Sequence, residues 1–245
     1  VKKERVEREV DFGVWGKRAY KMESWPPLES NPVVYNDFAH KCGLSEDWEF
    51  GDVFGLDEEL LAMVPQPCLA LIFLFPSNVK TKFDESKKGT KDVFFVRQIK
   101  RLDQACGTIA MMHAIGNNME VLGIGDGPLK DFINKDRNCT AEERGTKLAE
   151  NKGISELHTS FSKEGQTTAF KEGEKTDHHF VCFTCVDGNI YEFDGLKPAP
   201  TDHGAIPEGK TFLNQAAAVI KSVYLSNPDV TDVAMISLGG PNPFK

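Results

Sequence analysis

The alternation of apolar and polar residues predicts a chain in which helices and strands follow one another. Its central segment, residues 98–118, begins polar and becomes an apolar run that starts near Cys106 and stops at Gly116-Asn117-Asn118. Good helix formers followed by a glycine and two asparagines predict a buried helix that begins near Cys106. Residues 68–75 are apolar throughout, which is typical of a strand buried on both faces.

Shorter segments predict the remaining elements. We expect further helices, from caps and from glycine and proline stops, at residues 32–42, 57–63, 128–135, 140–151 and 211–225. We expect further strands at residues 48–54, 93–96, 179–186, 189–193 and 232–238. Asp187-Gly188 is a strong hairpin turn between two of these strands. This order, without a repeat or linker, predicts one α/β domain over residues 24–245 behind a charged N-terminal extension, residues 1–23.

Composition narrows the class of protein. The 29 basic and 37 acidic residues give a net charge of −8, which argues against binding to nucleic acid or anionic membranes. No apolar run approaches the roughly 20 residues that span a bilayer. The six cysteines are scattered through the chain rather than dense. We therefore expect reduced cysteines in an intracellular protein, located in the cytoplasm with the nucleus as a second compartment.

Cys182 and Cys185 resemble half of a metal site, but their spacing argues against one. Positions three apart on a strand face opposite sides of the sheet, so the two sulfur atoms cannot hold the same ion. No second pair of this kind accompanies them. We expect both to be packing residues, and we predict no metal and no cofactor.

Cys106 is the first candidate for chemistry. The N-terminus of a helix favours an anion, so a cysteine there is biased toward the thiolate. The alternative for a lone cysteine is a small buried packing residue. A thiol nucleophile also needs a histidine base and a group that orients the histidine.

Two adjacent histidines, His178 and His179, open a predicted strand and can supply that base. Asp194 ends the paired strand of the same hairpin, so it lies near the start of the histidine strand. A cysteine at a helix start with a histidine and an aspartate on a hairpin is the geometry of a cysteine protease. His113 lies seven residues past Cys106 on the same helix, about 10 Å along its axis, which is too far to contact the thiol.

Several motifs in order along the chain carry a resemblance to a known family. They are W-P-P-L-E-S-N-P (25–32), D-V-F-G (52–55), M-V-P-Q-P (63–67), A-C-G-T-I-A-M-M-H-A-I (105–115), E-G-Q-T (164–167), D-H-H-F (177–180) and Y-E-F-D-G-L-K-P (191–198). Together they resemble the ubiquitin C-terminal hydrolases of the papain-like cysteine protease class, in the branch that consists of the catalytic domain alone. The resemblance implies an α/β (α+β) fold with a central antiparallel sheet flanked by helices and a knotted backbone. It also implies that residues 159–176, a long polar connection, cross over the active site.

The resemblance implies roles for individual residues. Cys106 would be the nucleophile, His179 the general base and Asp194 the residue that orients it, with His178 as a lesser candidate for the base. The family has an oxyanion-hole glutamine six residues before the cysteine, where this chain has Lys100. Two other glutamines are near, Gln98 and Gln104; we expect Gln98 to be the donor.

The implied activity is a deubiquitinating thiol hydrolase that cleaves small or flexible adducts from the C-terminal glycine of ubiquitin through an acyl-enzyme. Two alternatives stay open: a dual ubiquitin and NEDD8 hydrolase, and a ubiquitin-binding or stabilising protein with weak activity. We expect a monomer. The residues that the resemblance places against ubiquitin are Pro27, Leu28, Glu29, Asp52, Glu164, Gly165 and Gln166. For Leu28 the alternative is core packing, and for Glu29 it is a solvated surface charge.

Overall fold

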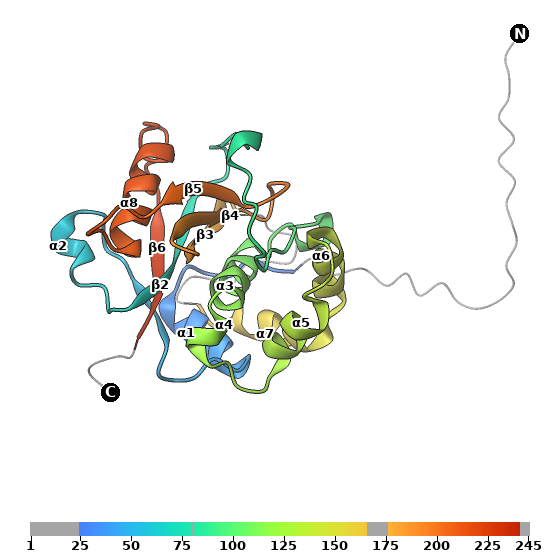
Figure 1. The fold of residues 1–245 in the computed structure, drawn as a ribbon. Coiled ribbons are helices and arrows are strands. Elements are labelled where there is room, and N and C mark those ends of the chain that lie inside the picture. Colours follow the sequence, from blue (N-terminus) through green and yellow to red (C-terminus); the bar gives the residue numbers. More distant parts are fainter. Residues whose placement is uncertain (1–24, 80, 166–175, 241–245) are drawn as a thin grey trace, which may run out of the picture.

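A computed structural model describes residues 25–79, 81–165 and 176–240. Its centre is an antiparallel sheet of six strands in the order β1-β6-β2-β3-β4-β5 (Figure 1). The strands are β1 (Glu49–Asp52), β2 (Cys68–Pro76), β3 (His178–Val186), β4 (Asn189–Phe193), β5 (Thr201–Ala205) and β6 (Ala234–Gly239). The predicted α+β fold with an antiparallel sheet flanked by helices is confirmed.

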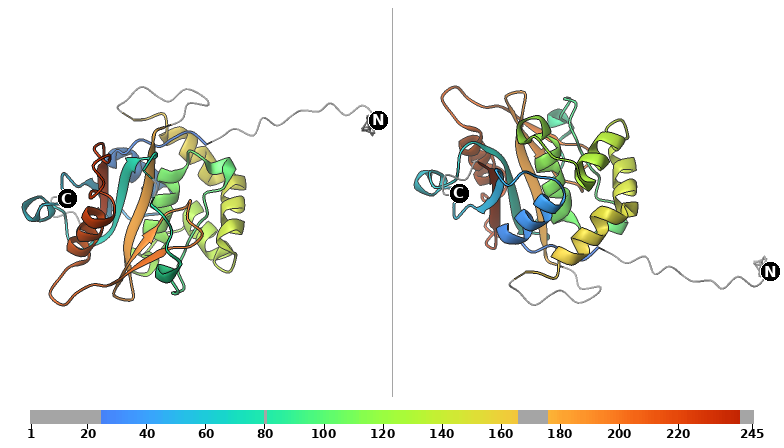
Figure 2. Two further views of the ribbon diagram at one scale, coloured as in Figure 1. Left: turned by 90° about the horizontal axis from the view of Figure 1, so that it is seen from above. Right: turned by 90° about the horizontal axis from the view of Figure 1, so that it is seen from below.

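Helices cover both faces of the sheet. They are α1 (Pro32–Lys41), α2 (Glu58–Leu61), α3 (Cys106–Gly116), α4 (Met119–Leu122), α5 (Pro128–Asp136), α6 (Ala141–Glu150), α7 (Lys152–Phe161) and α8 (Phe212–Val223). Figure 2 shows α8 on one face and the larger group of helices on the other. Helix α2 lies on the same side as α8 (Figure 1).

The pleat of the central strands sorts their side chains between two hydrophobic cores. Successive residues of a strand point to opposite faces. On β2, Ile72 belongs to the core under α1 and α3, while Leu71 and Phe73 belong to the core under α8. Strand β3 divides in the same way, with Cys182 in the first core and Phe183 in the second. An apolar run without alternation is therefore what a strand between two helix layers requires.

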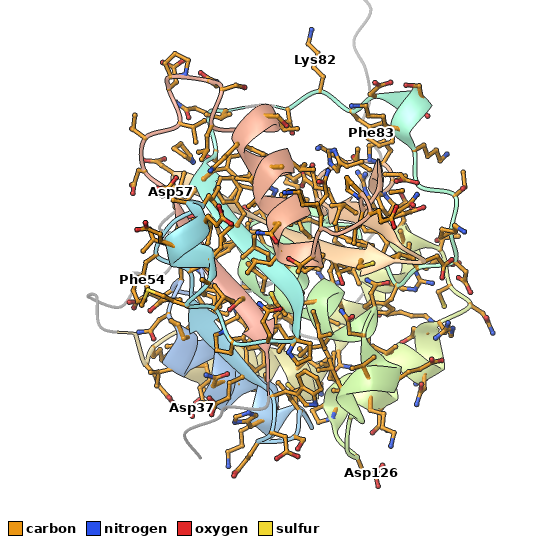
Figure 3. All side chains as sticks on the ribbon, turned by 60° about the vertical axis from the view of Figure 1, so that its left-hand side comes forward. Asp37, Phe54, Asp57, Lys82, Phe83 and Asp126 are labelled. Carbon is orange, nitrogen blue, oxygen red and sulfur yellow. The ribbon has the colours of Figure 1, made fainter. Side chains whose placement is uncertain are left out.

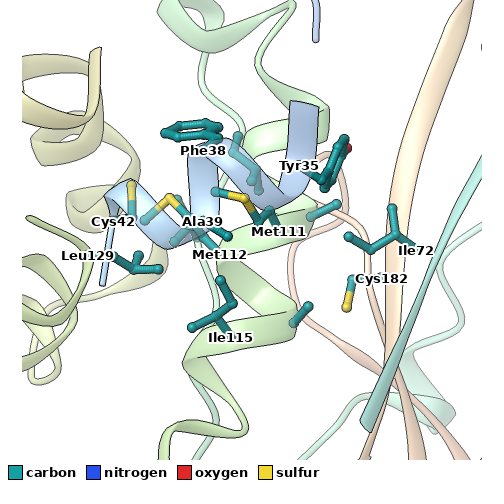
Figure 4. Packing of buried hydrophobic residues seen from close by; sticks show 14 of the residues in the cluster. Tyr35, Phe38, Ala39, Cys42, Ile72, Met111, Met112, Ile115, Leu129 and Cys182 are labelled. Atoms are coloured by element: carbon teal, nitrogen blue, oxygen red, sulfur yellow. The ribbon is translucent and has the colours of Figure 1, made fainter. Parts of the chain in front are cut away.

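Helix α3 is the centre of the larger core. All eleven of its residues are buried. In Figure 4, Met111 and Met112 of α3 lie against Phe38 of α1, with Ile72 of the sheet on the other side. The predicted buried helix beginning near Cys106 is confirmed, and the core around it fixes the position of that first residue.

Several elements differ from the sequence prediction. Residues 93–96 form no strand; side chains at the end of α3 bind two of their N–H groups instead. Asn117 Oδ1, on the C-cap residue, accepts from the Phe94 N–H at 2.8 Å, and His113 Nε2 accepts from the Val96 N–H at 3.0 Å. Strand β5 and helices α4 and α7 were not predicted. The predicted crossing segment, 159–176, therefore begins inside α7, and its residues 166–175 lie outside the described part of the chain.

Candidate active site

Cys106 is the first residue of α3 and is 6% exposed. The residue before it, Ala105, has no side-chain oxygen that could cap the helix, and the structure gives it no cap hydrogen bond. The N–H groups in the first turn of a helix have no hydrogen-bond partner within the helix. Here they are not capped by Ala105 and lie at the end of the helix that begins with Cys106. Together with the helix dipole, they stabilise negative charge beside the thiol.

His179 and Asp194 meet at the edge of the sheet next to Cys106. Strand β3 begins with His178-His179, and the β3–β4 register pairs Cys182 with Phe193, so Asp194 comes level with the start of β3. His179 Nε2 lies 2.8 Å from Asp194 Oδ1. Because Asp194 occupies Nε2, the other ring nitrogen is left to face the thiol of Cys106.

The imidazole of His179 is held in its charged form. Burial lowers the pKa of His179, but hydrogen bonds to Asp194 and to Cys106, with the attraction of both groups, outweigh burial and raise it to about 10. Asp194 shows the complementary change. Burial raises the pKa of its carboxyl, and the hydrogen bond and charge of His179, with the N–H of Leu196 at 2.9 Å, lower it overall. His179 and Asp194 therefore form an imidazolium–carboxylate pair beside Cys106.

His178, the lesser candidate for the base, has a different partner. Its Nε2 lies 2.9 Å from Asp232 Oδ2, on the segment that precedes β6. Each of the remaining histidines has a polar contact away from Cys106: His40 with Trp48 O, His113 with Val96 N, His158 with Thr108 Oγ1 and Pro26 O, and His203 with Glu192 Oε2. His203 lies on β5. Among the described histidines, only His179 interacts with both Asp194 and Cys106.

The two candidate glutamines lie on either side of Asp103 and differ in their contacts. Gln98 donates from Nε2 to Asp103 O at 3.0 Å, and its backbone N–H donates to Gly195 O at 2.8 Å, which joins it to the residue after Asp194. Gln104 also donates from Nε2 to Asp103 O, at 3.2 Å, but its Oε1 accepts the N–H of Thr176 at 3.0 Å. Both ends of the Gln104 amide are thus engaged. Gln98 Oε1, by contrast, is buried without a hydrogen-bond partner among the described residues, and both glutamines line the cavity that contains Cys106.

A cavity of about 680 Å³ opens at this site. Its lining includes Gln98, Cys106, His179 and Asp194, and it continues along the loop that follows β2. A volume of this size is within the range of ligand pockets, about 300–1,000 Å³.

The residues expected against ubiquitin divide between surface and core. Asp52, at the end of β1, and Glu164 are exposed. Pro27 is buried, and Leu28, at 3% exposed, packs in the larger core, as the core-packing alternative predicts. Glu29 lies against Gly165, so close that a Cβ on Gly165 would be 1.7 Å from Glu29 Oε2. Gln166 lies outside the described residues.

The remaining cysteines give no sign of a metal site. Cys182 is fully buried in the larger core, and burial raises the pKa of its thiol. Cys185, three residues on, is half-buried. The described residues contain no group of three or more His, Cys, Asp or Glu side chains placed to hold an ion. No helix among them is long and apolar enough to cross a membrane.

One buried network beside the site was missed in the sequence. Glu192, two residues before Asp194, is fully buried and accepts hydrogen bonds from Lys197 Nζ, from Tyr224 Oη at 2.9 Å and from His203 Nε2 at 2.8 Å. Burial raises the pKa of Glu192, but the bond from His203 and the charge of Lys197 lower it overall. The clue in the sequence was a charged residue between two aromatic ones, Tyr191 and Phe193, on a strand whose every other side chain is apolar or polar but uncharged.

An α+β fold that brings a helix-start cysteine to a histidine–aspartate pair defines a cysteine hydrolase of the papain-like class. Residues 25–224 match the family described as ubiquitin carboxyl-terminal hydrolase, family 1. The chain therefore belongs to the ubiquitin carboxyl-terminal hydrolase family and is a cysteine-type deubiquitinating enzyme.

Individual relatives agree with this membership. A ubiquitin carboxyl-terminal hydrolase of Drosophila melanogaster is 37% identical over 227 residues, which cover 89% of this chain and 98% of the relative. Ubiquitin carboxyl-terminal hydrolase 3 of Arabidopsis thaliana is 39% identical over 224 residues, 87% of this chain and 93% of the relative. The fold is shared with the UCH37 catalytic domain of Trichinella spiralis, solved bound to ubiquitin vinyl methyl ester. The TM-score is 0.70 at 23% identity, over 89% of this chain and 96% of that domain.

Proposed function

We propose that Cys106, His179, Asp194 and Gln98 form the machinery with which this enzyme hydrolyses bonds at the C-terminal glycine of ubiquitin. The observation that carries the proposal is the position of His179, between Asp194 at 2.8 Å and the thiol of Cys106 at the start of α3. Family membership gives the reaction class, and the geometry supports the proposed roles.

In the first half-reaction, the Cys106 thiolate attacks the carbonyl carbon of the terminal glycine and a carbon–sulfur bond forms. The Cys106 N–H and Gln98 Nε2 donate to the resulting oxyanion, and each such donor typically contributes about 3–4 kcal/mol. Collapse of this intermediate expels the leaving amine or thiol, which takes the proton of His179. In the second half-reaction, His179 removes a proton from water, the resulting hydroxide attacks the thioester, and the thiolate is released.

Ubiquitin is the partner that we propose for this site, with NEDD8 as a second modifier of the same chemistry. The exposed carboxylates of Asp52 and Glu164 and the net charge of −8 support contact with the basic tail of such a modifier. Glu29 and Gly165, which lie against each other, would form part of the same contact surface. Pro27 and Leu28 would support it from the core. The rates on ubiquitin and NEDD8 conjugates with the same fluorogenic leaving group measure the preference.

We propose that the enzyme acts as a monomer in the cytoplasm and nucleus. All six cysteines are free, which supports a reducing compartment. Sedimentation of the purified chain and imaging of a tagged copy test the two statements.

Reaction with a ubiquitin probe that carries a C-terminal electrophile tests partner and nucleophile together. We expect one covalent adduct, mapped by peptide mass spectrometry to Cys106 and absent in Cys106→Ala. Cys185→Ala is the matched control, because Cys185 is free and more exposed than Cys106 but lies outside the cavity. Modification of a different cysteine would overturn the assignment. Tight ubiquitin binding with neither adduct nor hydrolysis would favour the binding or stabilising alternative.

The assignment of Gln98 has its own test. Gln98→Ala should lower kcat by about 10²–10³-fold, as loss of one oxyanion donor does, with little change in the binding of ubiquitin to a Cys106→Ala background. Gln104→Ala is the matched control, because the same amide group is removed two residues before the nucleophile instead of eight. A larger loss from Gln104→Ala than from Gln98→Ala would reverse the assignment.

A further inference from the structure

Away from the active site, the side chains of one cysteine and one lysine are in contact. Lys147 Nζ lies 3.1 Å from Cys139 Sγ and 2.6 Å from Asp136 Oδ1. Cys139 stands two residues before α6, and Lys147 lies in the second turn of that helix. Among the described residues, Cys139 is the one cysteine that contacts a lysine. The reaction proposed at Cys106 uses none of these three side chains.

The turn between α5 and α6 holds this contact in place. Thr140 and Glu143 form a reciprocal cap, in which the Thr140 N–H donates to Glu143 Oε2 at 2.7 Å and the Glu143 N–H donates to Thr140 Oγ1 at 3.2 Å. Arg144, which is buried, donates to the carbonyls of Asp136 and Arg137 at the end of α5. The thiol before the turn and the amine after it are therefore kept together by the backbone that joins them.

A second lysine pair on α5 shows what is particular to this one. Lys130 Nζ lies 3.0 Å from Asp126 Oδ1, and Asp126 is fully exposed and points outward into solvent (Figure 3). An exposed pair of this kind is weak and leaves its amine mobile. The carboxylate of Asp136, in contrast, is only 5% exposed. It is shielded from water and holds Lys147 against the sulfur.

The lysine also favours the reactive form of the thiol, and the pair is open to solvent. Hydrogen bonds to Asp136 and Cys139 raise the pKa of Lys147, so its side chain is charged, and a positive charge in contact with a thiol favours the thiolate. Cys139 is half-buried and the Lys147 side chain is 45% exposed. A cavity of about 400 Å³ also has Asp136 and Lys147 in its lining. A molecule as small as hydrogen peroxide can therefore reach the pair.

We propose that Cys139 and Lys147 form a redox-sensitive crosslinking site, in which a peroxide oxidises the thiol and a sulfur–nitrogen bond then joins the two side chains. The inference does not rest on the proposed function, because Cys106 takes no part. In the first step, the Cys139 thiolate attacks one oxygen of the peroxide. A sulfur–oxygen bond forms, the oxygen–oxygen bond breaks, and the departing hydroxide takes up a proton to give water. The product is a sulfenic acid.

The second step joins the side chains as a sulfenamide. Lys147 Nζ gives up one proton, its electron pair forms a bond to the sulfur, and the sulfur–oxygen bond breaks; the departing hydroxide takes that proton and leaves as water. A second proton passes from the nitrogen to the Asp136 carboxylate and on to solvent. Sulfur is oxidised by two electrons, the peroxide becomes two waters, and the protein loses two hydrogen atoms. An excess of added thiol attacks the sulfur and restores both side chains.

Peptide mass spectrometry of the full chain tests the crosslink. The chain carries Cys106→Ala, so that the proposed nucleophile does not consume the oxidant, and it is treated with hydrogen peroxide and digested with trypsin without reductant. Trypsin cuts after Arg144, so the peptides of Cys139 and Lys147 stay together only if a bond joins them. We expect a linked pair that is two hydrogen atoms lighter than the sum of its peptides and that separates on treatment with dithiothreitol.

Lys147→Arg distinguishes crosslinking from simple oxidation. Arginine keeps a positive charge beside the thiol but stays protonated and offers no free amine. The linked pair should be lost, and Cys139 should instead be labelled by dimedone, which reacts with sulfenic acids. Cys139→Ser should lose both the link and the label. Cys185→Ala is the matched control, because Cys185 is also free and half-buried but has no lysine contact among the described residues, and this variant should keep the link in full.

Four results would overturn the inference. Two concern Cys139 itself: its conversion to sulfinic or sulfonic acid without a linked pair, and its failure to react under conditions that oxidise Cys185. The third is a bond from Lys147 to any other cysteine. The fourth is a linked pair that persists in Lys147→Arg, because the nitrogen would then come from another residue.

Discussion

At the scale of single residues, the catalytic proposal depends on the environment of His179. The side chain is 7% exposed, and without partners burial would drive its pKa down, as burial does for His113 and His158, to about 3 and about 4. Asp194 reverses this effect at one position. The same residue type is therefore neutral in two places in the core and charged in a third, and the difference is the hydrogen bonds to Asp194, at 2.8 Å, and to Cys106.

A pH-dependent stability follows from the charged histidine. We consider Cys106→Ala, in which the thiol no longer titrates with the ring. Because the pKa of His179 is raised above its ordinary value of 6.5, its contribution to stability is full below that value and is lost as pH rises toward the folded pKa, about 10 in the intact site. The variant lacks the hydrogen bond and charge of Cys106, so its folded pKa lies below that value; from about pH 7 up to that pKa, the free energy of unfolding should fall by up to roughly 1.4 kcal/mol per pH unit. Urea unfolding of Cys106→Ala at several pH values in this range measures the change in the free energy of unfolding.

The control for this prediction is Cys106→Ala with His179→Gln, which lacks the titrating ring. Its free energy of unfolding should change much less over the same pH range. His113 and His158 are neutral throughout that range and contribute equally to both proteins. Parallel pH profiles for the two variants would show that His179 is not charged in the folded enzyme.

Sequence reasoning reaches some site residues and not others for a physical reason. Cys106 and Asp194 could be found because each stands at the end of a well-predicted element. Periodicity cannot separate His179 from His178. The structure distinguishes them by their partners, which are Asp194 and Cys106 for His179 and Asp232 for His178. Lys197 follows the strand in an irregular segment, and its bond to Glu192 depends on the path of that segment, which no local pattern encodes.

At the scale of secondary structure elements, the prediction fails where the backbone partners of a segment come from a distant part of the chain. Residues 93–96 have the composition of a strand, yet Asn117 takes the place of a neighbouring strand for Phe94, accepting its N–H at 2.8 Å and donating to its carbonyl at 2.9 Å. Strand β5 is the opposite case, because its composition does not predict a strand and yet it forms one. Its sequence, Thr201–Ala205, is polar and contains a glycine, and it forms a strand because β4 offers it an edge.

Helix α7 was missed because of one shared residue. Asn151 ends α6 and also caps α7, where its side chain accepts the N–H of Ile154 at 3.0 Å. A single asparagine between two helical segments is interpreted as the end of the first helix. The polar sequence that follows gives no sign that a second helix begins there. The consequence for the site is that the described chain stays helical up to Phe161, so the proposed crossing segment is shorter than residues 159–176.

The start of α3 is the element on which the site depends most. Gly107 follows the nucleophile where a Cβ would lie 2.9 Å from Tyr35 Oη and 3.3 Å from Leu28 Cβ. The glycine therefore lets α1 and the Trp25–Leu28 segment pack directly against the helix end. Burial of Leu28 is part of this support, which gives a structural meaning to a residue of the W-P-P-L motif.

At the scale of the whole molecule, the site lies where the two cores meet. Cys106 belongs to the core under α1 and α3, whereas β3 residue Val181, on the same face as His179, belongs to the core under α8. The nucleophile thus lies on the face of the sheet covered by α1 and α3, and its base is a strand residue that points to the face covered by α8. Their alignment depends on how the sheet holds the layers together.

The Glu192 network ties one of these layers to the site. Glu192 on β4 joins Tyr224 beyond α8 and His203 on β5 to Lys197, and the Lys197 N–H donates to Asp194 O at 2.9 Å. A fully buried carboxylate with three donors stabilises the fold only while all of them are present. The network therefore fixes the segment between Asp194 and Lys197 against the α8 side of the sheet.

Removal of the carboxylate charge should destabilise the whole enzyme. Glu192→Gln leaves the ammonium of Lys197 buried without a counter-charge, and the free energy of unfolding should fall by about 3–5 kcal/mol. Lys197→Met should cost a similar amount, and the double variant Glu192→Gln, Lys197→Met should cost clearly less than the sum, because no single charge is left unpaired. Glu142→Gln, at an exposed pair 3.7 Å from Arg97, is the matched control and should stay within about 0.5 kcal/mol. Urea unfolding of the four variants measures these losses in the free energy of unfolding. If the loss in the double variant equals the sum of the losses in the two single variants, the buried charges act independently.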